Sequence, residues 1–181
     1  MKTILSISIC VLFLGIPFTS VGQSTSISST QLIPLTIGNY WVYSNSDDAE
    51  KFDTVKITRT KIIRTDTGYY YNGNLWLERN DSVYEFQSQR SGSIFPTLQY
   101  FSSDKPVEYG IVIGGDVLSR RSVTKLKAPY TVKGKEYLNC YEFAERREKG
   151  YVFTIISKGI GIIEIRSPER TRSLTEYKIE D

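Results

Sequence analysis

The sequence predicts an all-β protein: an antiparallel meander of about ten strands, curled into a half or open barrel. Two observations lead to this fold class. Turn signals rich in Gly, Pro, Asn and Asp recur roughly every 8 to 12 residues, and no window repeats apolar residues at helical spacing. Connections this short favour neighbouring antiparallel strands, because parallel strands need long crossovers that the sequence does not provide.

The stretch from Tyr151 to Arg166 predicts the central hairpin of the sheet. Two runs rich in β-branched residues flank Lys158-Gly159-Ile160-Gly161, which is a turn signal. In the first run the residues on both faces are largely apolar, so this strand should lie inside the sheet and be covered on both sides.

Residues 1–22 resemble a secretory signal peptide. A positive start is followed by an apolar run from Ile4 to Phe18, and small residues before the end of the segment place the cleavage after Gly22. The alternative is a lipoprotein signal, since Cys10 lies in this segment. We reject it because Cys10 follows the bulky Ile9 and sits in the middle of the run. The expected location is the periplasm or the medium.

Cleavage would remove 22 of the 181 residues and leave 159, enough for one domain with a core. Residues 23–31 are rich in Ser and Thr and should form a flexible leader, followed by a single β domain over residues 32–181. The remaining charges nearly balance, and no basic stripe suited to nucleic acid is visible. We interpret Arg120-Arg121 as a solvated strand end and Arg146–Lys149 as a turn.

The first half of the domain alternates strands and turns in a clear order. A turn at Gly38-Asn39 precedes a strand at Tyr40–Tyr43. Phe52–Arg64 alternates apolar and polar residues, which predicts one long half-buried strand with a wet face. Tyr69–Tyr71 and Leu75–Glu78 are expected to pair across the hairpin turn between them.

The second half of the domain is predicted to form strands of similar length. Asn80-Asp81-Ser82 matches a glycosylation sequon, but we interpret it as a turn. Pro96 demotes the segment that contains it to an edge strand or a loop. The expected strands are Val83–Gln87, Ile94–Phe101, Val107–Ile113, Val117–Lys127, a short strand that begins at Ala128-Pro129-Tyr130 and ends at Lys133-Gly134, Glu136–Ala144 and Leu174–Ile179.

The composition argues against catalysis. The chain has no histidine, which removes Ser-His-Asp sites and imidazole metal ligands, and we expect no catalytic residue, metal or cofactor. Cys140, the one cysteine left after cleavage, should be a small buried hydrophobe. A carboxylate pair for glycosidic cleavage is conceivable, but a charged wet face is the simpler interpretation. The carboxylates considered for such a pair are Glu78, Glu85, Glu142 and Glu164.

Aromatic residues are the most informative part of the composition, with 13 Tyr, 8 Phe and 2 Trp. Rings with a polar tip suit the lining of a cleft or a contact surface. The alternative is that they fill the core and pair across strands. The residues that we predict to bind a ligand are Tyr40, Trp41, Tyr43, Tyr69, Tyr71 and Trp76.

Two short motifs resemble those of small exported bacterial proteins of unknown function. Pro34–Tyr43 is similar to their P-L-x-x-G-N-x-W-x-Y start, and Lys158–Ile163 to their G-[IV]-G-[LI]-[IV] hairpin. Thr131–Tyr137 resembles a V-x-x-G-x-[YF] segment of TapB-like proteins, with one extra residue before the Tyr. The resemblance implies an antiparallel sheet curved into a half barrel and no catalytic residues. Many such proteins are lipoproteins, but this chain lacks the lipid-attachment Cys.

These observations predict an exported, non-enzymatic cell-envelope domain that acts as a monomer and binds a ligand or an envelope protein. The alternative is a carrier that holds an apolar small molecule or an acyl chain on the concave face of the sheet. An enzyme is the least favoured of the three hypotheses.

Overall fold

The structure is a computed structural model that describes residues 31–48, 50–63, 65–88, 94–113 and 116–180. The predicted signal peptide 1–22 and all but the last residue of the leader 23–31 lie outside these residues. The described chain forms fifteen strands, pairs them antiparallel throughout and contains no helix. The all-β antiparallel class is therefore confirmed.

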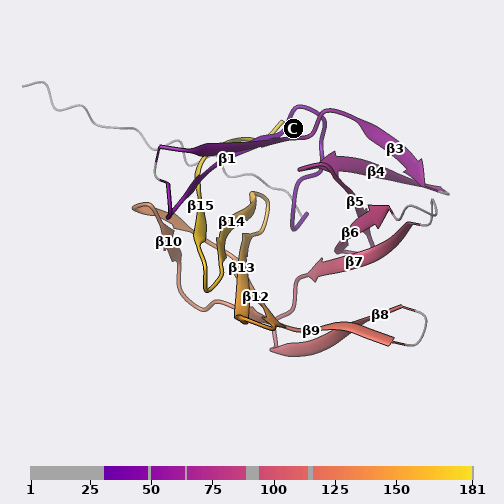
Figure 1. The fold of residues 1–181 in the computed structure, drawn as a ribbon. Coiled ribbons are helices and arrows are strands. Elements are labelled where there is room, and N and C mark those ends of the chain that lie inside the picture. The colour runs from indigo at the N-terminus through magenta and orange to yellow at the C-terminus, as the bar shows by residue number, and fades with distance from the viewer. Residues whose placement is uncertain (1–30, 49, 64, 89–93, 114–115, 181) are drawn as a thin grey trace, which may run out of the picture.

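The described strands form three sheets (Figure 1). The eight-stranded sheet has the order β2 (Phe52–Lys56), β1 (Tyr40–Asn45), β15 (Thr171–Lys178), β14 (Gly161–Arg166), β13 (Gly150–Ser157), β12 (Cys140–Arg147), β9 (Asp116–Lys125) and β8 (Val107–Ile113). The five-stranded sheet has the order β3 (Thr60–Ile63), β4 (Asp66–Tyr71), β5 (Asn74–Arg79), β6 (Ser82–Ser88) and β7 (Ile94–Phe101). The third sheet is a hairpin of β10 (Tyr130–Val132) and β11 (Lys135–Tyr137).

The architecture differs from a single curled meander of ten strands. Of the two large sheets, only the five-stranded one follows the chain order from edge to edge. In the eight-stranded sheet the first strand, β1, pairs with the last, β15, so the two ends of the domain are joined. None of the three described sheets is closed or strongly curled, so the prediction of a sheet curled into a half barrel was wrong.

The predicted strand Phe52–Arg64 is divided between two sheets. Its first part is β2, an edge of the eight-stranded sheet, and its second part is β3, an edge of the five-stranded sheet. Ile57 lies between them, fully buried, and exchanges backbone hydrogen bonds of 3.0 Å with Gly38 and Asn39. Alternation along the chain specifies which residues are buried but not which strand they pair with, so the crossing was not foreseen.

The hairpin of β13 and β14 lies inside the eight-stranded sheet as predicted, with its turn at residues 158–160. Ile155 and Ile156 point to opposite faces and are both 0% exposed, which confirms that this part of the strand is covered on both sides. The prediction for Pro96 is also confirmed, because β7 is an edge strand.

The two faces of the eight-stranded sheet are covered differently. The β10–β11 hairpin lies over one face, where the Tyr130 hydroxyl donates to Glu164 and Val132 is buried. The register of β13 and β14 directs Ile165 to the face opposite Glu164, and this second face meets the five-stranded sheet. The space between the two large sheets contains the candidate site.

Candidate functional site

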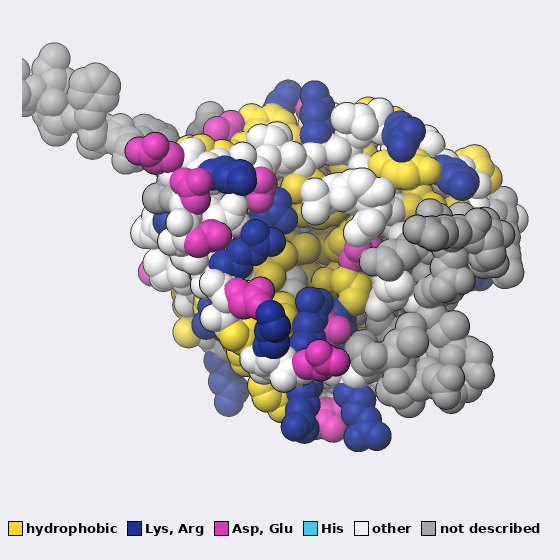
Figure 2. Space-filling model, viewed as in Figure 1, with side chains coloured by type: hydrophobic (Ala, Val, Ile, Leu, Met, Phe, Trp, Pro, Cys, Tyr) yellow, Lys and Arg dark blue, Asp and Glu magenta, His cyan; other side chains and the backbone are white. Residues whose placement is uncertain are grey.

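A cavity of about 650 Å³ lies between the five-stranded sheet and the second face of the eight-stranded sheet. Figure 2 shows a hollow on this side of the molecule, with hydrophobic side chains inside it and charged side chains around it. Its volume is in the range of small-molecule sites, about 300–1,000 Å³. The residues that line it and are discussed below are Tyr43, Tyr71, Asn72, Asn74, Trp76, Glu85, Tyr100, Arg121, Glu145, Arg147, Lys149, Val152, Ile165, Glu169, Arg170 and Arg172.

A row of aromatic rings forms the wall on the side of the five-stranded sheet. The centroids of Tyr71 and Trp76 are 4.8 Å apart, and those of Trp76 and Tyr100 are 5.7 Å apart with the rings stacked. Asn72 and Gly73 adopt the positive φ values that the predicted hairpin turn requires. This turn sets the register that brings Tyr71 and Trp76 to the same face of the sheet.

Three of the six aromatic residues predicted to bind a ligand line this cavity: Tyr43, Tyr71 and Trp76. The Tyr43 hydroxyl donates to the Ile162 carbonyl oxygen at 2.8 Å and lies 3.0 Å from the Tyr71 hydroxyl. Burial raises the pKa of Tyr43 well above its ordinary value and that of Tyr71 to about 12. Both phenols are therefore neutral hydrogen-bonding groups at physiological pH.

The other three predicted residues lie elsewhere. Trp41 is 0% exposed, and its Nε1 donates to the Ile160 carbonyl oxygen at 2.6 Å, so this ring belongs to the core. Tyr40 points away from the cavity and donates its hydroxyl to Glu176 at 2.7 Å. Tyr69 packs against the core and is not among the cavity-lining residues. Whether any of the six binds a ligand stays a prediction.

A buried ion pair forms one side of the cavity. Arg121 Nη2 lies 2.6 Å from Glu145 Oε2, and Arg121 is only 5% exposed. The same Glu145 oxygen forms a second ion pair with Nη2 of the more exposed Arg147, at 2.8 Å. Our interpretation of Arg121 as a solvated strand end was therefore wrong. The pairing of β9 with β12 places it opposite Glu145, a partner that the sequence does not reveal.

Glu85 brings a further carboxyl group to the cavity from β6. It is 6% exposed and accepts a hydrogen bond from Asn74 Nδ2. Burial raises the pKa of Glu85 above its usual range, although the Asn74 hydrogen bond and the charge of Arg121 lower it. Glu85 was expected on a wet face; the structure instead buries it opposite Trp76 on the neighbouring strand.

The other carboxylates considered in the sequence do not line the cavity. Glu142 pairs with Arg166 at 2.8 Å, and Glu164 accepts the Tyr130 hydroxyl on the opposite face of the sheet. Glu78 is half-buried, and burial together with the nearby Asp81 raises its pKa. Glu164, whose side chain is 12% exposed beneath the β10–β11 hairpin, therefore does not lie on the wet face that we expected for it.

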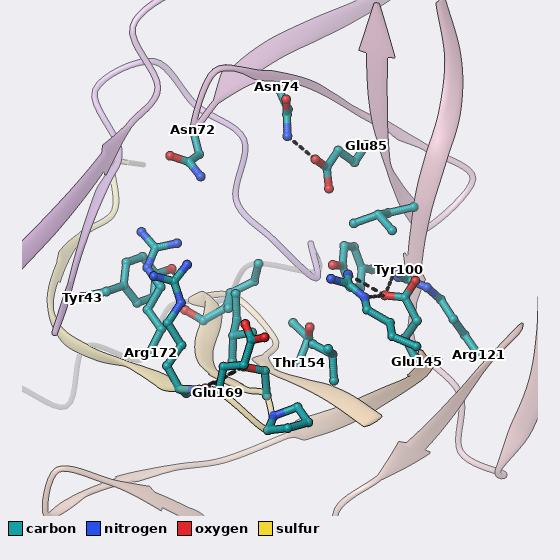
Figure 3. Close-up of a pocket in the computed structure, with 18 of the residues that line it drawn as sticks. Tyr43, Asn72, Asn74, Glu85, Tyr100, Arg121, Glu145, Thr154, Glu169 and Arg172 are labelled. Carbon is teal, nitrogen blue, oxygen red and sulfur yellow. Dashed lines mark hydrogen bonds and ion pairs between the residues drawn. The ribbon is translucent and has the colours of Figure 1, made fainter. Parts of the chain in front are cut away.

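Arg172 lies on the other side of the cavity from Arg121 (Figure 3). Its guanidinium carbon lies 4.3 Å from the centroid of the Tyr43 ring, a cation–π contact. Its Nε is 3.6 Å from Asp53 Oδ2 and, within the described residues, has no hydrogen-bond partner. Arg172, Arg121 and Glu145 come from three strands far apart in the chain, so no sequence motif announces them.

Two other kinds of site find no support in the described residues. No cluster of three or more Cys, Asp or Glu residues there is placed to hold a metal ion. Cys140 is buried, as expected, and burial raises the pKa of its thiol to about 11, so it is a poor nucleophile. Within the same part of the chain, no helix is long and apolar enough to cross a membrane.

Comparisons with known proteins assign no family. No family model and no curated protein matches the chain. Among solved structures, the chain is similar to the crystal structure of a presumed lipoprotein from Parabacteroides distasonis, with a TM-score of 0.33 and 11% sequence identity. That match covers 83% of this chain and 99% of the other. Similarity this distant carries no argument about function, and the resemblance to TapB-like proteins stays a prediction.

Proposed function

We propose that this protein is an exported, non-enzymatic β domain that binds a small polar molecule in the cavity between its two large sheets. One observation carries the proposal: buried charged groups and phenols line an open volume that is large enough for a small molecule. Arg121 and Glu85 are both more than nine-tenths buried, and a ligand is a reason to keep such groups inside a protein.

The same residues argue against an acyl chain, which was the alternative function. A hydrocarbon in this cavity would displace water from Glu85, Arg121 and Arg172 and offer no hydrogen bond in return. A polar ligand satisfies these groups, while the apolar side chains Val152 and Ile165 contact its less polar parts.

We propose binding rather than catalysis because the charged groups engage one another. Glu145 is held by two arginines, and Glu85 accepts a hydrogen bond from Asn74. Neither arrangement pairs a nucleophile with a base that activates it. The proposed export rests on the signal-like residues 1–22.

A substitution that fills the cavity tests the proposal. Val152→Trp places a large ring in the space between the sheets, whereas Tyr151→Trp changes the neighbouring residue on the opposite, exposed side of β13. Both proteins and the wild type would be purified from their own cell envelope and measured by native mass spectrometry.

We expect a small-molecule adduct on the wild type and on Tyr151→Trp, and its loss from Val152→Trp. Circular dichroism would establish that both variants are folded. An adduct that survives in folded Val152→Trp, or no adduct on any of the three proteins, would contradict the proposal.

A further inference from the structure

We infer that the ligand of this cavity is a small zwitterion, whose ammonium group binds at Glu85 and whose carboxylate binds at Arg172. The inference rests on the proposed function and names the ligand class. It comes from two charged groups, on opposite sides of the same space, whose partners inside the protein are incomplete (Figure 3).

Glu85 is the acidic end of the cavity. Among the described residues it accepts a hydrogen bond from Asn74 and forms no ion pair within 4.0 Å. Arg121, the nearest buried cation, is committed to Glu145 at 2.6 Å. Two carboxyl groups therefore share one buried guanidinium, since Arg147 is largely in solvent. An ammonium group beside Glu85 would supply the missing positive charge.

A second group at this end suits a donor with several N–H bonds. Asn74 uses its amide nitrogen on Glu85, which leaves its amide oxygen as an acceptor. A carboxylate and an amide oxygen together suit an ammonium group, which has three donors and no acceptor.

Arg172 is the basic end. The ring of Tyr43 supports one face of its guanidinium, and the contact with Asp53 is long, 3.6 Å. Asp53 is itself partly in solvent and accepts a hydrogen bond from Asn45 at 3.3 Å. The planar fork of an arginine held in this way matches a carboxylate, which can accept two parallel hydrogen bonds from it.

A second arginine strengthens the basic end. Arg170 also lines the cavity, and no ion pair of the described residues includes it. The amide of Asn72 lies on the same side (Figure 3) and offers further hydrogen bonds. The cavity thus has Glu85 and Glu145 at one end, together with Arg121 and Arg147, and Arg170 and Arg172 at the other, together with Glu169. An uncharged sugar would add no charge next to Glu85 or Arg172, whereas a zwitterion supplies one to each.

The probe is a set of amino acids, dipeptides and tripeptides with free termini. Matched sets carry an acetylated amino terminus, which removes the ammonium charge, or an amidated carboxyl terminus, which removes the carboxylate. Binding to the purified full-length domain would be measured by thermal shift and then by calorimetry.

We expect saturable binding of members of the free set, and a loss of at least about tenfold in affinity when either terminus is blocked. In Glu85→Gln the loss of affinity caused by acetylating the amino terminus should fall below about threefold, while the loss caused by amidating the carboxyl terminus should remain. Arg172→Gln should show the reverse pattern. Glu142→Gln and Arg166→Gln alter an ion pair that does not line the cavity, and they should keep both losses of affinity.

Two results would overturn the inference: no saturable binding in the free set, or affinities that do not change when the termini are blocked. Its failure can be told apart from that of the proposed function. An adduct that Val152→Trp abolishes, but that lacks an ammonium or a carboxylate group, keeps the binding function and rejects the zwitterion.

Discussion

The space between the two large sheets is closely packed around Trp41 and hollow around Glu85 and Arg121. Trp41 and Tyr71 touch, with ring centroids 5.1 Å apart, and Tyr71 also lines the cavity, so the two regions are continuous. The Trp41 indole is fully buried and its N–H has a partner. In the hollow region, by contrast, Trp76 is also buried, with 4% of its surface exposed, but its indole N–H has no hydrogen-bond partner among the described residues.

Within the same two sheets, the region around Trp41 therefore serves packing, and the region around Glu85 and Arg121 is suited to binding. A buried aromatic residue with every polar atom satisfied contributes to stability and offers a ligand nothing. Buried charges beside empty volume cost stability and are available to a ligand. The substitutions below test this contrast, in order of decreasing expected effect.

Trp41→Ala should produce the largest loss of stability, about 4 kcal/mol, because it leaves a cavity in the packed region. Urea unfolding followed by circular dichroism would measure it. Tyr40→Phe, on the outward face of the same strand, removes only an exposed hydrogen bond to Glu176 and should cost far less stability than Trp41→Ala. Similar costs for the two substitutions would contradict the assignment of Trp41 to the core.

Arg121→Gln should cost about 3 kcal/mol, because it leaves Glu145 and Glu85 without their buried cation. The matched control is Lys149→Gln, which breaks an exposed 2.5 Å ion pair with Glu169 and should cost less than about 1 kcal/mol. Equal midpoints of urea unfolding for the two variants would show that burial adds nothing to the Arg121 pair.

Gly161→Ala should cost about 2 kcal/mol. Gly161 has a φ of +104°, and a Cβ there would lie 3.4 Å from the Trp41 indole nitrogen. Gly73→Ala is the control, since its φ is also positive but no atom lies within 4 Å of the added Cβ. The thermal midpoint of Gly161→Ala should therefore fall further than that of Gly73→Ala; a reversed order would contradict close packing at Trp41.

Glu85→Gln should change the free energy of unfolding least, and at neutral pH it should stabilise the protein rather than destabilise it. Because the folded pKa of Glu85 is raised, the folded state holds its proton more tightly than the unfolded state. The contribution of the Glu85 carboxyl to stability is therefore present at low pH. It is lost as the pH rises from the pKa of this group in the unfolded state through its pKa in the folded state.

Thermal unfolding of wild type and Glu85→Gln from pH 4 to pH 8 would measure this contribution. The wild type should lose stability relative to the variant as the pH rises, and the variant should be the more stable protein at pH 8. Parallel pH profiles would show that burial does not perturb this carboxyl group.

The local signals of the sequence were reliable where the structure depends on neighbouring residues. The hairpin turns at Asn72-Gly73 and at residues 158–160 were predicted because Asn and Gly accept positive φ. Half of the predicted aromatic site residues reached the cavity. Trp41 and Tyr43 lie on one face of β1, so alternation alone could not separate the core ring from the cavity ring.

The sequence by itself determined that this chain forms antiparallel strands, where most turns occur and which faces are apolar, because these properties repeat over a few residues. Only the tertiary structure decided that β1 joins β15, that the chain changes sheets at Ile57 and that Arg121 meets Glu145. Those choices depend on contacts between residues far apart in the chain, and a period of two is the same for every possible partner strand.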